Sequence, residues 1–218
     1  LSLLIDTSGE VQLPEPGTGG PIRLDSDGGP LTVSGGRMLT MGGEVSLRSG
    51  AGTLEVLPGS PFSIAGGSVD LRSDNTITIT GPSTGPDFGT LMAFGGPLSG
   101  NTQASSGPGL DFEGTIHTIT DPLTELTYDV NSLFLATPPD LSGTVGNLDL
   151  ETAGSSINLR NLYLGFLPLP LIDESSVLPD PREVFGQDLP LPSASGAATI
   201  NSAGADLSFS ENAKLAMP

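Results

Sequence analysis

Apolar and polar residues alternate along short stretches of this chain, and glycine-rich turns separate the stretches. Between residues 43 and 65 three such stretches follow one another, and their apolar positions are Val45, Leu47, Leu54, Val56, Phe62 and Ile64. A period of two residues is typical of a β-strand that buries one face. No stretch shows the spacing of three and four residues that an amphipathic helix requires. The pattern therefore predicts three short strands within about 24 residues.

The same pattern is repeated along the chain. The stretch "GGEVSLRSG" at 42–50 is nearly rewritten as "GGSVDLRSD" at 66–74, and further copies occupy 146–165 and 196–218. Residues 1–13 fit a partial copy, with apolar positions at Leu3, Ile5, Val11 and Leu13. Repeats of 20 to 50 residues indicate a solenoid, a propeller or an array, and a propeller blade needs about 40 residues. Three strands in about 24 residues favour a solenoid.

We therefore predict an all-β fold: a right-handed parallel β-helix with three faces, forming a single domain over 1–218. In such a fold the inward side chains of successive windings stack into a core that no single winding could bury. Val45 and Val69 should be neighbours one winding apart. Glycines suit the corners because they adopt positive φ without steric cost. A β-sandwich is the alternative, since it also has short alternating strands with frequent turns, but the repeated Gly-Gly-x-Val-x-Leu-Arg-Ser favours the solenoid.

Two segments interrupt the repeat, at about 81–114 and 165–195. In the first, the stretch at 90–94 predicts a strand, and the glycine-rich residues on either side of it predict loops that project from a corner. The second is rich in proline, which is excluded from central strands. We predict that it folds back onto the rod, which would bury its large apolar residues: Leu167, Leu169, Leu171 and Phe185.

Residues 114–140, between the two interruptions, alternate again. Their apolar positions are Ile116, Ile119, Leu126, Tyr128 and Val130. We interpret this stretch as a further winding with less regular corners.

Composition narrows the range of partners. The formal net charge is −18, which would repel nucleic acids and anionic membrane surfaces. The chain has no cysteine, so disulfides and thiolate metal sites are excluded. No stretch approaches the roughly 20 apolar residues of a membrane helix. The chain starts without Met or a basic segment, so we interpret it as a processed or excised chain.

Few residues suggest chemistry. His117 is the single histidine, and we predict an outward-facing position on a strand because no nucleophile or orienting partner is indicated. Asp25 and Asp27 resemble half of a calcium loop but lack the closing Glu, so we interpret them as turn formers. The glycine pairs lack the Lys-Ser/Thr of a phosphate loop. The threonines at 76–80 do not recur in equivalent stretches, as an ice-binding ladder would require.

Carboxylates on outward positions are the remaining candidates. Glu44 and Asp70 fall near equivalent positions of successive copies, Arg48 and Arg72 fall nearly in register, and Glu55 also points outward. Cross-strand charge compensation is the predicted result. A polysaccharide-cleaving β-helix would need paired carboxylates on one face, or a basic residue with calcium near a carboxylate cluster. We predict no catalytic, cofactor-binding or metal-binding residue, no cofactor, and no enzymatic activity.

The stretches "GGEVSLRSGAGTLEV", "GGSVDLRSDNTITIT" and "GNLDLETAGSSINL" resemble the degenerate repeats of filamentous-haemagglutinin-like exoproteins of the two-partner secretion route. The resemblance covers about 19–96, 146–164 and 196–217. It implies a right-handed parallel β-helix, an extracellular or cell-surface location, and a structural or adhesive role. The low cysteine content of the family matches, whereas its N-terminal Asn-Pro-Asn-Gly type secretion motif does not occur here.

The functional prediction is a stalk segment of a surface adhesin, or a subunit of an extracellular filament assembled end to end. Expected partners are copies of the chain itself or host and cell-surface glycans, with no nucleic acid and no membrane insertion. The alternative is a β-helix that binds or cleaves polysaccharide.

Overall fold

The computed structural model describes residues 20–40, 42–84, 87–120, 125, 127–140, 142–165 and 196–216. Within these ranges the chain forms β-strands β1 to β18 and no helix. Sixteen of the strands belong to two large parallel sheets, and the other two form an antiparallel hairpin.

The first sheet forms one flat face of the molecule. Its six strands pair in parallel in the order β1 (Ile22–Ser26), β3 (Glu44–Ser49), β5 (Ser68–Ser73), β8 (Leu98–Thr102), β13 (Leu148–Thr152) and β16 (Ala198–Asn201). Between consecutive strands of this sheet the chain passes through the second sheet and returns.

The second sheet is strongly curled, and its long strands β2 (Leu31–Leu39) and β4 (Leu54–Gly66) pass around the bend. Residues 54–56 of β4 pair with β6, whereas residues 62–66 pair with β7. One limb, the second face, continues with β6 (Ile77–Thr80), β9 (Pro108–Glu113), β14 (Ser156–Arg160) and β17 (Leu207–Phe209). The other limb, the third face, continues with β7 (Gly89–Ala93), β12 (Leu133–Ala136), β15 (Leu162–Gly165) and β18 (Lys214–Ala216).

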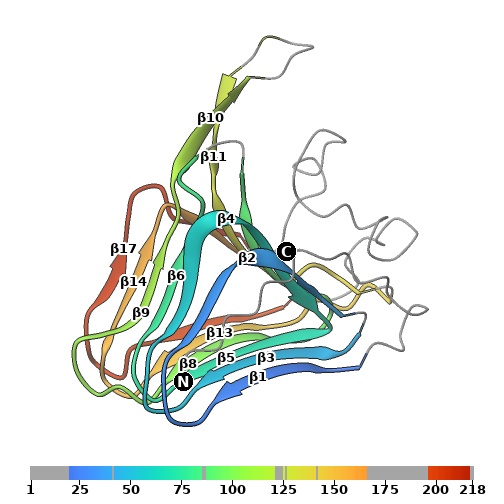
Figure 1. Cartoon of the computed structure of the whole chain (residues 1–218). Coiled ribbons are helices and arrows are strands. Elements are labelled where there is room, and N and C mark those ends of the chain that lie inside the picture. Colours follow the sequence, from blue (N-terminus) through green and yellow to red (C-terminus); the bar gives the residue numbers. More distant parts are fainter. Residues whose placement is uncertain are drawn as a thin grey trace.

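One passage of the chain through the three faces is called a winding here. The described residues contain six windings, which start at β1, β3, β5, β8, β13 and β16. Figure 1 shows the faces as the sides of a triangle, with β1, β3 and β5 side by side along one side and β6, β9, β14 and β17 along another. The fold is therefore all-β and solenoid-like, with parallel pairing from one winding to the next.

Strand pairing places equivalent side chains of successive windings next to each other. Val45 is paired in register with Val69, and Leu47 with Leu71, so the predicted proximity of Val45 and Val69 is confirmed. All four side chains are fully buried in one continuous apolar core that draws on all three faces. The period-two alternation therefore identified the inward side chains of these strands correctly.

Glycines at one corner let the backbones of successive windings approach closely. The amide of Gly67 donates a hydrogen bond to the carbonyl of Gly43, at 2.7 Å. A Cβ added at Gly96 would overlap the carbonyl oxygen of Gly67, and a Cβ at Gly146 would overlap that of Gly96. The same holds for Gly196 against Gly146. This column has no room for a side chain, which explains why glycine recurs at this point of the repeat.

The prediction of projecting loops within 81–114 is wrong for two segments, which form strands instead. Residues 98–102 and 108–113 form β8 and β9, which complete the first two faces of the fourth winding. The apolar residues here are sparse, because Gly100 occupies an inward position between Leu71 and Leu150. The strands form nevertheless because parallel neighbours on both sides satisfy their backbone groups.

The predicted winding at 114–140 is also wrong in part. Strands β10 (Ile116–Thr120) and β11 (Thr127–Asn131) form an antiparallel hairpin, and only β12 returns to the third face. Figure 1 shows the hairpin projecting from a corner of the triangle. Period-two alternation is common to parallel and antiparallel strands, so the pattern alone did not separate the two.

A second apolar cluster lies on the outward side of the third face. It consists of Ala65, Phe88, Met92, Phe94, Phe134, Ala136 and Tyr163, all buried. The Phe134 ring centroid lies 5.6 Å from that of Phe88 and 5.9 Å from that of Tyr163. Burial raises the pKa of Tyr163 to about 12. The third face is thus apolar on both sides.

Several predictions fall outside the described residues. They are the partial copy at 1–13 and the folding back of 165–195, whose residues beyond Gly165 are not described. The same holds for Leu126.

Candidate functional site

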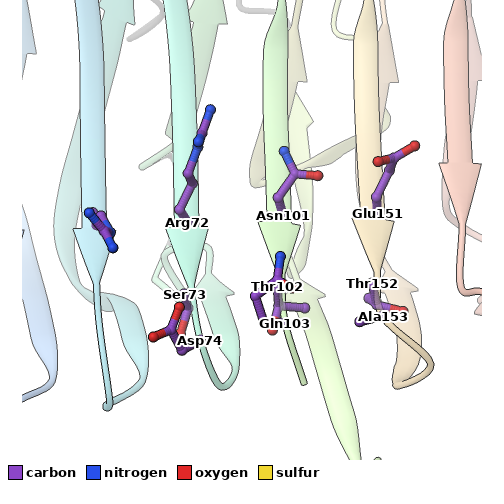
Figure 2. A pocket seen from close by; sticks show the side chains of 10 residues that line it. Arg72, Ser73, Asp74, Asn101, Thr102, Gln103, Glu151, Thr152 and Ala153 are labelled. Atoms are coloured by element: carbon purple, nitrogen blue, oxygen red, sulfur yellow. The ribbon is translucent and has the colours of Figure 1, made fainter. Parts of the chain in front are cut away.

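A groove of about 610 Å³ lies on the outward side of the first face, where its strands reach the first corner. The groove crosses four windings and is lined by Arg48, Arg72, Ser73, Asp74, Asn101, Thr102, Gln103, Glu151, Thr152 and Ala153. Figure 2 shows that Arg72, Asn101 and Glu151 occupy matching places on neighbouring strands and project to the same side of the sheet. The groove thus contains a row of polar side chains that runs across the strands, from one winding to the next.

Strand register builds this row. Arg48 pairs with Arg72, Arg72 with Asn101, and Asn101 with Glu151. Adjacent strands of a sheet are about 4.8 Å apart, so the polar groups repeat at that spacing. One position of the repeat, occupied by a polar residue in each of the four windings, therefore defines the groove.

The residue after each row member points inward and fixes the corner. Ser73 donates a hydrogen bond to the carbonyl of Gly52 at 2.9 Å, and Thr152 donates one to the carbonyl of Ser155 at 2.6 Å. Thr102 bonds the carbonyl of Asn75 in the same way. All three side chains are buried, and a buried hydroxyl is stable only with such a partner. The floor of the groove is therefore held by bonds between side chain and backbone.

Two ion pairs involve the arginines of the row. The Nε of Arg72 lies 2.7 Å from Oδ2 of Asp70 on the same strand, and Nη1 of Arg48 lies 3.6 Å from Oδ2 of Asp25 on the preceding winding. Both arginine side chains remain more than half exposed, so they stay accessible to a ligand. Glu151 at the opposite end of the row supplies a carboxylate.

Ion pairs between neighbouring windings do form, as predicted, but Glu44 and Asp70 are not at equivalent positions. The register of Arg48 with Arg72 is confirmed, whereas Glu44 pairs with Ser68 and Asp70 pairs with Ser46. Glu44 instead forms an ion pair with Arg23 of the preceding winding, at 3.0 Å. The two-residue offset between Glu44 and Asp70 placed them in different outward rows.

A further ion-pair cluster links β9 to β14. The guanidinium of Arg160 contacts Asp111 at 2.8 Å and Glu113 at 3.0 Å. Glu55, the remaining carboxylate candidate, lies half-buried on β4 in register with Thr78. It is not among the residues that line the groove.

The prediction that His117 faces outward is wrong. The residue is only 8% exposed and its ring packs edge-on against Phe88, with the ring centroids 6.3 Å apart. It lies on β10 opposite Val130, which itself packs against the apolar cluster of the third face. The hairpin base is therefore apolar on this side, and strand alternation alone did not reveal that contact. The Nε2 atom of His117 is buried without a hydrogen-bond partner within the described part of the structure.

Asp25 and Asp27, the two residues that resembled half of a calcium loop, lie in different local structures. Asp25 is part of β1 and pairs with Arg48, so its interpretation as a turn residue is wrong. Asp27 does lie in the turn that follows β1. Across the described ranges, no three His, Cys, Asp or Glu side chains are grouped so that they could hold a metal ion.

Sequence reasoning missed the groove because Asn101, Thr102 and Gln103 fell in a stretch that was interpreted as a loop. Aligning Gly95-Gly96 with Gly66-Gly67 would have placed Asn101 opposite Arg72, and this signal was present in the sequence. The groove offers guanidinium and amide donors and carboxylate acceptors, and its lining contains no aromatic ring. It is chemically suited to a polar, extended ligand.

Comparison with protein-family models, with curated proteins and with solved structures finds no match to this chain. The part of the chain that the structure describes contains no helix of the length and apolarity that crossing a membrane would take.

Proposed function

We propose that this chain is a non-enzymatic structural or adhesive β-solenoid that is displayed outside the cell. In this proposal the windings form a right-handed, three-faced parallel β-helix of the filamentous-haemagglutinin-like kind. The chain serves as a stalk segment of a surface adhesin or as a subunit of an extracellular filament.

One observation carries the proposal: the inward side chains are in register through successive windings. On the second face the first five members of the row are buried, and the sixth, Leu207, is exposed; the five are Leu31, Leu54, Ile77, Leu110 and Ile157. A winding contacts only its neighbours, so such a core extends by adding windings without redesign. This property suits a protein whose task is to span a distance.

The charged groups of the first face are consistent with this role. Arg23, Arg48 and Arg72 each contact a carboxylate, so much of their charge is compensated on the surface itself. The remaining acidic excess keeps a long exposed surface solvated.

Electron microscopy of the purified protein tests the structural role. Short rods or continuous fibres of constant width are expected, because stacked windings have a fixed cross-section. Globular particles without a long axis would contradict the proposal.

Polysaccharide binding is the second candidate function, and the groove favours it. Arg72, Asn101 and Glu151 present hydrogen-bonding groups at regular steps along a line, which suits a linear polymer of repeating hydroxyl groups. A glycan array should then show binding that Asn101→Ala reduces, while Thr78→Ala on the second face leaves it unchanged. No binding by the unmodified protein would remove this candidate.

The non-enzymatic part of the proposal has its own test. A reducing-sugar assay on the glycans of the array should show no release of new ends. Turnover that Glu151→Gln abolishes, with the fold retained by circular dichroism, would contradict it.

A further inference from the structure

The groove on the first face changes in charge along its length. Arg48 and Arg72 belong to the second and third windings, and Glu151 belongs to the fifth. Between them, in the fourth winding, lie the uncharged side chains of Asn101 and Gln103. The groove therefore has a cationic end, a stretch of neutral amides and an anionic end.

Asp74 adds a further charge to the lining, two residues beyond Arg72 in the third winding. Figure 2 shows Asp74 and Gln103 at matching places beside the row, one on each of two neighbouring windings. The third winding therefore presents both signs of charge, whereas the second presents a cation and the fifth presents an anion.

The polar groups of the groove can bind a ligand without losing contacts within the protein. Within the described ranges, no hydrogen bond or ion pair engages the side chains of Asn101, Gln103 or Glu151. Asp70 contacts Arg72 through Nε, at 2.7 Å, and a guanidinium has further donors on its other two nitrogens. Donors and acceptors of the groove are thus accessible along its whole length.

The spacing of the windings selects a polymer by its repeat length. Neighbouring strands are about 4.8 Å apart, so Arg48 and Glu151, three windings apart, are separated by about 14 Å. A sugar ring with its glycosidic oxygen is roughly as long as one step of about 4.8 Å. An extended peptide advances only about 3.3 Å per residue, so its side chains would lose step with the windings. The groove therefore matches four consecutive sugars better than a peptide.

The net charge of the chain narrows the charge pattern of that glycan. A net charge of −18 repels a glycan that has acidic sugars only, and it attracts any polycation without preference for the groove. A glycan with both signs of charge avoids the repulsion and gains at both ends of the groove. Its carboxylates accept charge-assisted hydrogen bonds from guanidinium groups, and its ammonium groups pair with the protein's carboxylates.

We propose that the groove binds a linear glycan in which acidic and amino sugars alternate. The first acidic sugar lies at Arg48, and the second lies at the amides of the fourth winding, with Arg72 one winding from the first and one from the second. The ammonium groups of the amino sugars face Asp74 and Glu151. This glycan is a particular case of the polysaccharide ligand of the second candidate function, so the proposal depends on that function.

Calorimetric titration of the full chain with four tetrasaccharides tests the charge pattern. N-deacetylated hyaluronan alternates glucuronate with glucosamine, hyaluronan lacks the free amines, chitosan lacks the carboxylates, and cellulose has neither charge. The N-deacetylated hyaluronan should bind at least about tenfold more tightly than each of the others, and added sodium chloride should weaken it. Equal binding of any other tetrasaccharide would overturn the alternating glycan but keep polysaccharide binding. Binding of none of the four would remove both and leave the structural role standing.

Glu151→Gln locates the binding in the groove, because it keeps the shape of the side chain and removes its charge. It should weaken the N-deacetylated hyaluronan by about tenfold without weakening hyaluronan itself, which has no amine for Glu151. Glu55→Gln, which removes the same charge outside the groove, should weaken neither, and circular dichroism checks that both variants are folded. An equal loss in the two variants would show a response to net charge and overturn the site. Tighter binding of a peptide of alternating glutamate and lysine would overturn the choice of a glycan.

Discussion

The third and sixth windings contain the same alternation of apolar and polar residues but differ in their surroundings. Val69, Leu71 and Ile77 of the third winding lie between two neighbouring windings and are fully buried. Leu207 and Phe209 of the sixth have a neighbouring winding on one side only among the described strands and remain nearly half exposed. Alternation thus decides which way a side chain points but does not by itself decide whether that side chain is buried. The free energy of folding should therefore reside mainly in contacts between windings.

The largest expected effect is at the glycine column, where windings touch through their backbones. A Cβ in Gly96→Ala would overlap the carbonyl oxygen of Gly67, and neither backbone can move without breaking the register. We expect a loss of about 3 kcal/mol or more in the free energy of unfolding.

Gly28→Ala is the control for this change, because a Cβ there would meet nothing within 4 Å. Chemical denaturation followed by circular dichroism measures both variants. Equal stability of the two would show that the windings do not contact each other through this column.

The next effect is expected in the core of the third winding. Leu71→Ala removes a fully buried side chain between Leu47 and Gly100, and the surrounding strands cannot collapse into the space. A loss of about 2–5 kcal/mol in the free energy of unfolding is expected. The midpoint of a urea titration reports it, and a loss below that of Leu207→Ala would contradict the comparison.

Leu207→Ala is the matched change in the sixth winding and should cost far less. The side chain is 45% exposed, so its truncation should lower the stability of the monomer by less than about 1 kcal/mol. A cost as large as that of Leu71→Ala would mean that the sixth winding is covered in solution.

The smallest effect is expected for the outward row. Arg48 is half exposed and contacts Asp25 at 3.6 Å, so Arg48→Ala should change the free energy of unfolding by at most about 0.5 kcal/mol. Thermal unfolding at low and high salt provides the check. A large, salt-dependent loss of stability would show that surface ion pairs contribute substantially to the free energy of unfolding, which we attribute to the core.

Sequence alone anticipated much of the repeat. The inward positions expected in the second, third and fifth windings are buried, including Leu148, Leu150, Ile157 and Leu159. On the first two faces each strand of these windings has two alternating large apolar residues, so the period is readable. The fourth winding was missed because an inward position is Gly100, whose space is bordered by Phe112 and Leu150 from other strands.

The candidate site was less accessible to sequence reasoning. Arg48, Asn101 and Glu151 are far apart along the chain, and only the register of four strands brings them into one row. A one-residue error in that register would have moved each side chain to the opposite side of the sheet. The burial of His117 depends likewise on contact between the hairpin and Phe88, which no local pattern encodes.

The most direct test of stacked windings is a series of spin-label distances along one outward row. Ser46, Asp70, Ser99 and Asp149 are consecutive register partners on the first face. With one label at position 46 and the second moved to 70, 99 and 149, the backbone separation should increase in equal steps of about 4.8 Å. Distances that do not increase step by step along this series would contradict a solenoid built of stacked windings.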